Sequence, residues 1–151
     1  MKNIQPRLIS LFKEGYCTPQ IGRIARELDE PAATIHYNIK KLENSGTIRT
    51  YKAVFDYKKI DEGFCAYMLI ALSSSEYAEP ERVAAQLSRH REVESVDILA
   101  GDWELLLKIR TKSQDEFFEF LKEVVAKEKG IENTNSIISL KQVKTEFVLT
   151  I

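Results

Sequence analysis

Apolar and polar residues follow two different periods along this chain. In the N-terminal part, apolar residues recur every three or four positions, as in helices that bury one face. One such stripe contains Ile21, Ile24 and Leu28, and a second contains Ile35 and Ile39. From Phe64 onward, stretches in which apolar and polar residues alternate, as in strands, are separated by stretches with helical periodicity. We therefore expect a small helical region followed by a mixed α and β region.

The two N-terminal stripes are close enough together to form a helix-turn-helix. Thr18 is expected to cap the first helix, with Pro19 at its first helical position. The Asp29-Glu30-Pro31 break separates the two helices, and Gly46 is expected to end the second. A further helix is expected over Gln5 to Glu14.

The polar face of the second helix is suited to DNA. Such a helix can lie in the major groove, with its first residues near base edges and its cations near phosphates. The β-prone run Thr47 to Phe55 is expected to form a wing beside it. The residues expected to bind DNA are Ala33, Thr34, His36, Tyr37, Asn38, Lys40, Lys41, Arg49, Tyr51 and Lys52. Helix pairs also occur in many bundles, and adjacent lysines often form a solvated face, so this alternative stays open.

The charge distribution supports DNA binding. Residues 1–60 hold 11 Lys and Arg against 6 Asp and Glu, whereas residues 61–151 hold 11 against 17. The overall net charge of −1 and the pI of 6.2 conceal this asymmetry. A basic half beside an acidic half favours a polyanion bound at the N-terminal end.

The C-terminal region predicts an α+β fold. Its order of strand, helix, strand, strand, helix, strand favours a four-stranded antiparallel sheet with both helices on one face, as in ferredoxin-like domains. The third and second strands are expected to pair as a hairpin. The expected elements are Phe64 to Ser73, Pro80 to Arg89, Val93 to Leu99, Leu105 to Ile109, a helix from Ser113 to about Gly130, and Thr134 to Leu140.

The helices of this region have recognisable buried faces. Ser113 and Glu116 form a capping box at the start of the second helix, and Gly130 is expected to end it. The expected buried stripes are Val83, Ala84 and Leu87 in the first helix, and Phe117, Leu121 and Val124, with Phe118 and Val125 beside them, in the second.

The other face of the sheet is left uncovered in this arrangement. Apolar residues on a bare face favour pairing with a second copy, and symmetric dimers are the commonest outcome. The tail Val143 to Ile151, in which Phe147, Leu149 and Ile151 alternate, is expected to add a strand across such an interface.

Other classes of protein are disfavoured. The longest apolar run, Phe64 to Leu72, is too short for a membrane span, and no signal peptide opens the chain, so we expect a cytoplasmic protein. Cys17 and Cys65 lack a CxxC spacing and are expected to be free, buried thiols. No metal-ligand spacing or pair of nucleophile and base is visible, so we expect neither an enzyme nor a cofactor.

Three stretches resemble the Lrp/AsnC family of bacterial and archaeal transcription regulators. They are LAGDWELLLKI at Leu99 to Ile109, SGTIRTYKAVFD at Ser45 to Asp56, and Gly63-Phe64 at the start of the second domain. The resemblance covers nearly the whole chain. It implies a winged helix-turn-helix DNA-binding domain over 1–55, a hinge over 56–63, and a ferredoxin-like effector-binding and oligomerisation domain over 64–151. It also implies a sequence-specific DNA-binding regulator, forming dimers and rings of dimers, whose assembly or DNA affinity is modulated by a small ligand.

The resemblance also implies a site for this ligand, commonly an amino acid, between dimers. A carboxylate would suit the ammonium group of an amino acid, and backbone N–H groups would suit its carboxylate. Glu104 stands where the family usually has Asp. Alternatively, Gly101-Asp102 is only a hairpin turn and Trp103 a packing residue. The implied effector-binding residues are Gly101, Asp102, Trp103, Glu104, Thr134 and Ser136.

The chain departs from the family pattern at the second helix of the helix-turn-helix. Pro31-Ala32 replaces the usual Ser-Pro, so Asp29 or Glu30 is expected to supply the cap. Tyr37 and Asn38 stand where arginines are common, so base contacts do not carry over from the family.

Two other functions stay open. Siroheme decarboxylases are similar to this family, but with only His36 and His90 the chain offers no histidine cluster for an anionic tetrapyrrole. A ligand-binding or assembly partner that has lost DNA binding is the third hypothesis.

Overall fold

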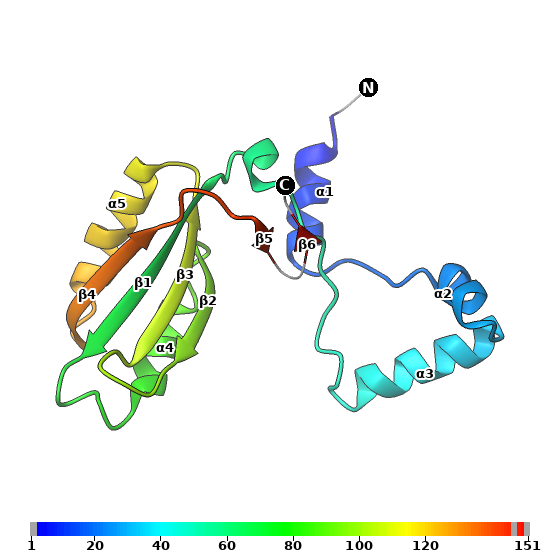
Figure 1. Cartoon of the computed structure of the whole chain (residues 1–151), viewed down its shortest axis with the longest axis horizontal. Helices are drawn as coiled ribbons and strands as arrows, with labels where there is room; N and C mark the ends of the chain where they lie inside the picture. Colours follow the sequence, from blue (N-terminus) through cyan, green and yellow to red (C-terminus); the bar gives the residue numbers. More distant parts are fainter. Residues whose placement is uncertain (1–2, 146–147, 150–151) are drawn as a thin grey trace. The chain divides into compact units, whose positions relative to one another are not determined.

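The computed structural model describes residues 3–145 and 148–149. These residues form two compact units, which divide between Val54 and Phe55. Figure 1 shows the order of the elements along the chain. They are α1 (Gln5–Lys13), α2 (Ile21–Leu28), α3 (Ala32–Asn44), the 3-10 helix η1 (Tyr57–Ile60), β1 (Phe64–Leu72), α4 (Pro80–Leu87), β2 (Val93–Ile98), β3 (Leu105–Thr111), α5 (Gln114–Glu123), the 3-10 helix η2 (Val125–Lys127), β4 (Ile131–Ile138), β5 (Lys144–Thr145) and β6 (Val148–Leu149). None of the described helices is long and apolar enough to cross a membrane.

The helix pair α2 and α3 is present where the sequence predicts it. Asp29 ends α2 in a left-handed conformation with φ 50°, which a short polar side chain tolerates. Ser45 is the C-cap of α3, and Gly46 follows it with φ +72°. The N–H of Gly46 donates to the carbonyl of Glu43. The predicted end of the second helix is therefore confirmed.

The predicted caps of both helices and the predicted start of the first are wrong, whereas the second helix begins directly after the Asp29-Glu30-Pro31 break, as expected. Helix α2 begins at Ile21 with Gln20 as its N-cap, because the Ile21 N–H donates to the Pro19 carbonyl in a tight turn before the helix. Pro31 is the N-cap of α3, and no side chain caps this end. Asp29 does not cap α3 because it already ends α2, and Glu30 does not replace it.

The run Thr47 to Phe55 also differs from expectation. The structure assigns no strand there, so the expected wing is not formed as a paired strand. A strand ladder requires a second strand, and the described residues of the N-terminal unit contain none.

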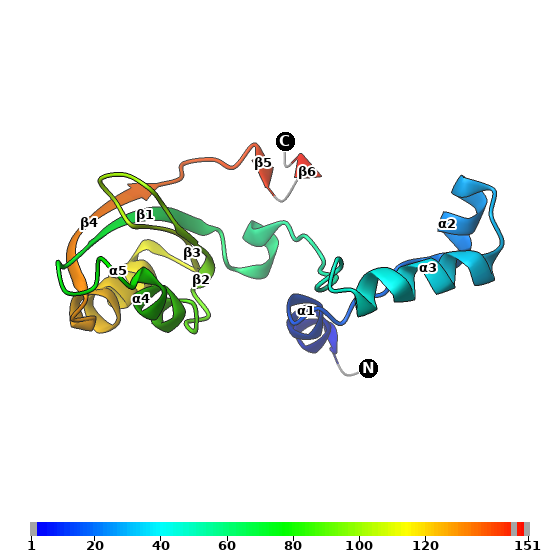
Figure 2. The ribbon, with the colours of Figure 1, turned by 90° about the horizontal axis from the view of Figure 1, so that it is seen from below.

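The C-terminal unit has the predicted α+β fold. The strands of its four-stranded sheet lie in the order β2-β3-β1-β4, all antiparallel, and β2 and β3 form the expected hairpin. Helices α4 and α5 lie on the same face of the sheet (Figure 2). Antiparallel neighbours with one covered face explain the alternating burial along β1.

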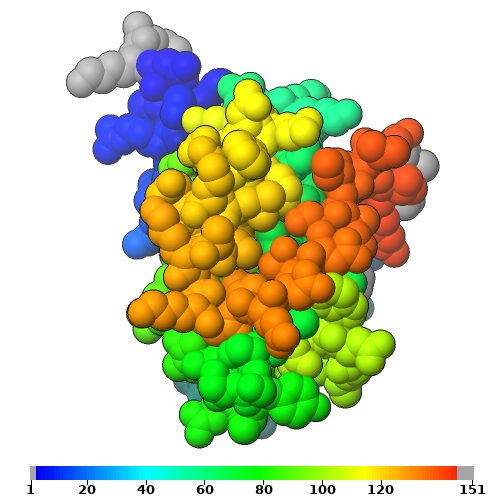
Figure 3. Space-filling view, turned by 90° about the vertical axis from the view of Figure 1, so that its left-hand side faces the viewer, coloured from blue at the N-terminus to red at the C-terminus, as the bar shows by residue number. Residues whose placement is uncertain are grey.

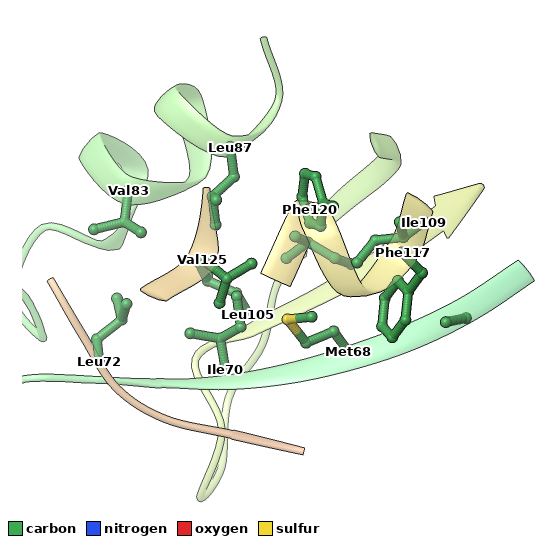
Figure 4. Close-up of a cluster of buried hydrophobic side chains, with 12 residues drawn as sticks. Met68, Ile70, Leu72, Val83, Leu87, Leu105, Ile109, Phe117, Phe120 and Val125 are labelled. Carbon is green, nitrogen blue, oxygen red and sulfur yellow. The ribbon is translucent and has the colours of Figure 1, made fainter. Parts of the chain in front are cut away.

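The core lies between this sheet and its two helices. Met68 and Ile70 of β1 point toward Phe117 and Phe120 of α5 and toward Val125 (Figure 4). The full buried cluster is Ala66, Met68, Ile70, Leu72, Val83, Leu87, Leu105, Leu107, Ile109, Phe117, Phe120 and Val125.

The buried stripe and the end of helix α5 differ from the prediction. Phe118 is 56% exposed, with the Lys122 ammonium 4.9 Å from its ring centroid, whereas Phe120 is buried. Helix α5 ends at Glu123, so Gly130 does not terminate it. Instead, a Cβ at Gly130 would come within 2.7 Å of Val83 Cγ2, because the backbone passes close to α4 there.

The sheet face opposite the helices is covered only in part by the described residues. Tyr67, Leu69 and Leu106 are half-buried on it, and Ile137 is half-exposed. Strands β5 and β6 pair with each other. The predicted alternation of Phe147, Leu149 and Ile151 is untested, because Phe147 and Ile151 lie outside the described residues.

Candidate functional site

Helix α3 separates an inner face from an outer face. Ile35 is buried and Ile39 is half-buried, whereas Tyr37 is 68% exposed. The exposed residues among those expected to bind DNA are Ala33, Thr34, His36, Tyr37, Asn38, Lys40 and Lys41 on α3, with Arg49 and Lys52 after it. The structure therefore brings most of the predicted DNA-binding residues to the surface of one helix and the segment that follows.

Several of the predicted DNA-binding residues, among them Asn38, Lys40 and Tyr51, already have hydrogen-bond partners within the protein. The Asn38 amide donates to the Thr34 carbonyl at 2.8 Å, one turn earlier on the helix. The Lys40 ammonium pairs with the carboxylate of Glu43 at 2.6 Å, and the half-buried Tyr51 donates its hydroxyl to the same carboxylate at 3.2 Å. Hydrogen bonding and charge from Glu43 raise the pKa of Lys40.

The segment after α3 is fixed by close packing. Gly15 has φ +91°, and a Cβ there would come within 2.5 Å of Thr50 Oγ1. The Ser45 and Thr47 hydroxyls lie 2.9 Å apart. The chain between Arg49 and Lys52 is therefore held near the end of α1 without a strand.

The expected effector loop lies between β2 and β3. Gly101 adopts φ +146°, which strongly favours glycine, and both Gly101 and Asp102 are exposed. Trp103 is half-buried. The glycine conformation agrees with a tight loop, as both the effector-site and the hairpin-turn hypotheses require.

Glu104 is bound to the sheet. Its N–H donates to the Ile70 carbonyl at 3.0 Å, and its Oε2 accepts from the Leu72 N–H at 2.7 Å. Ile70 is the last residue of β1 that pairs with β3, so the Leu72 N–H, two positions further, has no backbone partner on that strand. A carboxylate has about four acceptor positions, so Glu104 can still accept from a ligand.

Thr134 and Ser136 lie on the other side of β1. Ile70 is opposite Leu105 on β3 and opposite Thr134 on β4, so the loop and Thr134 lie near the same end of the sheet, on opposite sides of β1. Figure 3 shows the orange β4 and the yellow-green loop on one face of this unit. Two strand spacings separate β3 from β4, about 10 Å. The two halves of the expected site are therefore neighbours without direct contact across β1.

The sequence did not predict the ionic network on the open sheet face. Arg110 is 6% exposed, pairs with Glu94 through both carboxylate oxygens, and lies 3.5 Å from the Tyr57 ring centroid. Arg110 also donates to the Glu62 carbonyl and to Gln142 at 2.8 Å. This network joins η1, the sheet and the chain before β5.

The network also sets pKa values. Burial opposes ionisation of Glu94, but hydrogen bonds from Arg110 and Lys108 outweigh it and lower the pKa of Glu94. Burial raises the pKa of the Cys65 thiol despite the nearby charge of Arg110. In the sequence, Lys108 and Arg110 alternate with apolar residues. This pattern predicts that the two charged side chains lie on a solvent-facing side of the strand rather than being buried.

Known proteins similar to this chain point to one family. Residues 65–149 match the family model described as the Lrp/AsnC ligand binding domain. The HTH-type transcriptional regulator FL11 of Pyrococcus abyssi is 32% identical over 141 residues, which cover 93% of this chain and 90% of that protein. An uncharacterized HTH-type transcriptional regulator of Pyrococcus horikoshii is 29% identical over 97% of both chains.

Solved structures agree in fold. A transcriptional regulator of Neisseria meningitidis, solved as an L-Met complex, matches with a TM-score of 0.74 at 20% identity, covering 96% of this chain and 93% of that one. The feast or famine regulatory protein of M. tuberculosis, complexed with L-methionine, has a TM-score of 0.73 at 19% identity over 95% and 92% of the two chains. From the matching family model and the regulators that align over nearly its full length, this chain belongs to the Lrp/AsnC family of transcriptional regulators.

Proposed function

We propose that residues 1–55 bind duplex DNA through the exposed face of α3. The observation that carries the proposal is the division of this helix, with Ile35 buried and Tyr37, Lys40 and Lys41 exposed. Residues near the start of α3, such as Thr34, approach base edges, and the cations approach phosphates. Arg49 and Lys52 extend the phosphate-binding surface.

Anisotropy titration of a labelled duplex tests this proposal. The duplex spans the region upstream of the protein's own gene, and a scrambled duplex serves as control, each at two salt concentrations. We expect tighter binding to the upstream duplex and a linear fall of log affinity with log salt concentration. Equal or absent binding to both duplexes would overturn sequence-specific DNA binding by this chain.

Replacing Lys41 by alanine tests the role of α3 within that binding. Lys41 is exposed on the helix, so the change leaves the buried Ile35 untouched. Loss of one phosphate contact reduces the magnitude of the salt slope by about 0.9 and weakens binding to both duplexes. An unchanged slope would place Lys41 outside the DNA footprint.

We also propose that a small ligand, an amino acid, binds around the loop of Gly101 to Glu104 and the strand residues Thr134 and Ser136. Glu104 is held in place by the sheet and retains acceptor positions for an ammonium group. Two regulators of the same fold were solved with L-methionine. Because about 10 Å separates the two halves of the site, a second copy supplying one half fits a ligand this small.

Calorimetric titration with each amino acid tests the ligand, and repetition with DNA present tests the coupling. Ligand and DNA must change each other's affinity by the same factor, about 5- to 150-fold for typical couplings. Glu104→Gln keeps the side-chain length but removes the charge, so it should weaken amino-acid binding. Absence of heat with every amino acid would contradict this part of the proposal.

The assembly we propose is a homodimer, with rings of dimers, in the cytoplasm. The half-exposed apolar residues opposite the helices support a second copy on that sheet face. Native mass spectrometry measures the assembly directly. A monomer at micromolar concentration would contradict this proposal.

A further inference from the structure

Glu43 engages two residues of the proposed DNA-binding surface at once. One carboxylate oxygen pairs with the Lys40 ammonium at 2.6 Å, and the other accepts from the Tyr51 hydroxyl at 3.2 Å. Hydrogen bonding from Lys40 lowers the pKa of Glu43, so the carboxylate stays ionised at neutral pH. One anionic group therefore connects α3 with the segment after it.

The stability of α3 does not explain the position of Glu43. It lies in the last turn of a helix that ends at Asn44, where negative charge opposes the helix dipole. In this pair the lysine precedes the glutamate, which is the less favourable order along a helix. The Lys40 side chain is 57% exposed, so the pair contributes little to folding.

A DNA phosphate and a carboxylate offer a lysine the same kind of anionic oxygen ligand. We propose that Glu43 is an internal competitor for DNA phosphate. It occupies Lys40 and Tyr51 in the free protein and lowers affinity for duplexes of every sequence. This inference rests on the proposed DNA binding by α3. Glu43 is thus an affinity-setting residue of that surface.

The variant Glu43→Gln tests the competition. Glutamine keeps the length of the side chain and an oxygen for Tyr51, but it does not neutralise Lys40. With Lys40 available to phosphate, affinity for the scrambled duplex should rise roughly 2- to 5-fold, as expected for release of an exposed ion pair. The salt slope should steepen by about 0.9, because one more counterion is released. Loss of folding cannot mimic a gain in affinity.

Two further variants separate competition from a general change of charge. Glu27→Gln removes the same charge from an exposed position on α2 and should leave the salt slope unchanged. Adding Lys40→Ala to Glu43→Gln should abolish the gain. The competition is overturned, and the proposed DNA binding stands, if wild type binds DNA and Glu43→Gln behaves like Glu27→Gln. The same holds if the gain in affinity persists without Lys40. If neither wild type nor Glu43→Gln binds any duplex, the proposed DNA binding is overturned with it.

Discussion

The two units of this chain differ in how much apolar surface they bury by themselves. The C-terminal unit encloses twelve buried hydrophobic residues between its sheet and two helices. Among the described residues of the N-terminal unit, only Ile35 is buried. In α1, Leu8, Leu11 and Phe12 remain 38%, 41% and 37% exposed. The C-terminal unit therefore has a core of its own, whereas the N-terminal unit has little apolar burial to stabilise it.

This difference in buried apolar surface implies a difference in stability between the two units. Small domains bury a low fraction of their surface and are marginally stable, so binding of a partner adds substantially to the stability of their folded state. Under the proposed function, DNA binding would therefore stabilise the N-terminal unit. The C-terminal sheet holds Glu104 and Thr134, two residues of the proposed ligand site. The following changes test the comparison.

The largest contrast is expected between matched leucine substitutions in the two units. Leu107→Ala opens a cavity under a side chain with no exposure and should lower the free energy of unfolding by about 2 to 5 kcal/mol. Leu11→Ala should cost less than about 1 kcal/mol, as at most exposed positions. Urea unfolding followed by Trp103 fluorescence and by circular dichroism measures both. Equal losses would remove the distinction between the units.

The buried ionic network should give the next effect. Arg110→Ala leaves the Glu94 carboxylate paired with Lys108 and should cost about 3 kcal/mol, the lower end for breaking a buried pair. Arg110→Lys keeps the charge without the planar fork and should lose less stability. Thermal unfolding of both variants provides the measurement. If the lysine variant loses as much stability as alanine, charge pairing is not what Arg110 contributes.

Each unit carries one cysteine, which makes thiol labelling a probe of local opening. Cys17 is partly exposed, whereas Cys65 is buried and burial raises the pKa of its thiol. Cys17 should react roughly 100-fold faster than Cys65 at pH 8, because only thiolate that reaches solvent reacts. The variants Cys17→Ser and Cys65→Ser show which thiol gives the fast and which the slow phase of labelling. In urea, both thiols should react at similar rates. Comparable rates in buffer would mean that the C-terminal unit opens as readily as the N-terminal one.

The smallest effect is expected at a helix cap. The Ser113 hydroxyl accepts from the Glu116 N–H, and the Glu116 carboxylate accepts from the Lys112 N–H. Ser113→Ala should therefore cost about 1 kcal/mol. Gln114→Ala, one position later on the exposed side, serves as a control with little expected change. Urea unfolding of the two variants tests the cap, and equal stabilities would show that it contributes nothing.

Much of the fold could be predicted from the sequence because its signals are local. Alternation along Phe64 to Leu72, the cap at Ser113 and the stop at Gly46 each depend on residues a few positions apart. They were enough to predict the order of strands and helices, the hairpin of β2 and β3, and helices on one face of the sheet. The exposed polar face of α3 was predictable for the same reason.

The details that the sequence left open depend on neighbours distant along the chain. Arg110 is buried because Tyr57, Glu94 and Gln142 meet around it. Glu104 is held by Leu72, 32 positions away, just beyond the last pair of β1 and β3, a contact that no local pattern signals. The expected wing lacks a strand because a β-prone run also needs a partner strand. Residue type and spacing therefore determined the order of the helices and of the paired strands, whereas only tertiary structure decided which charges are buried, since burial depends on what packs against them.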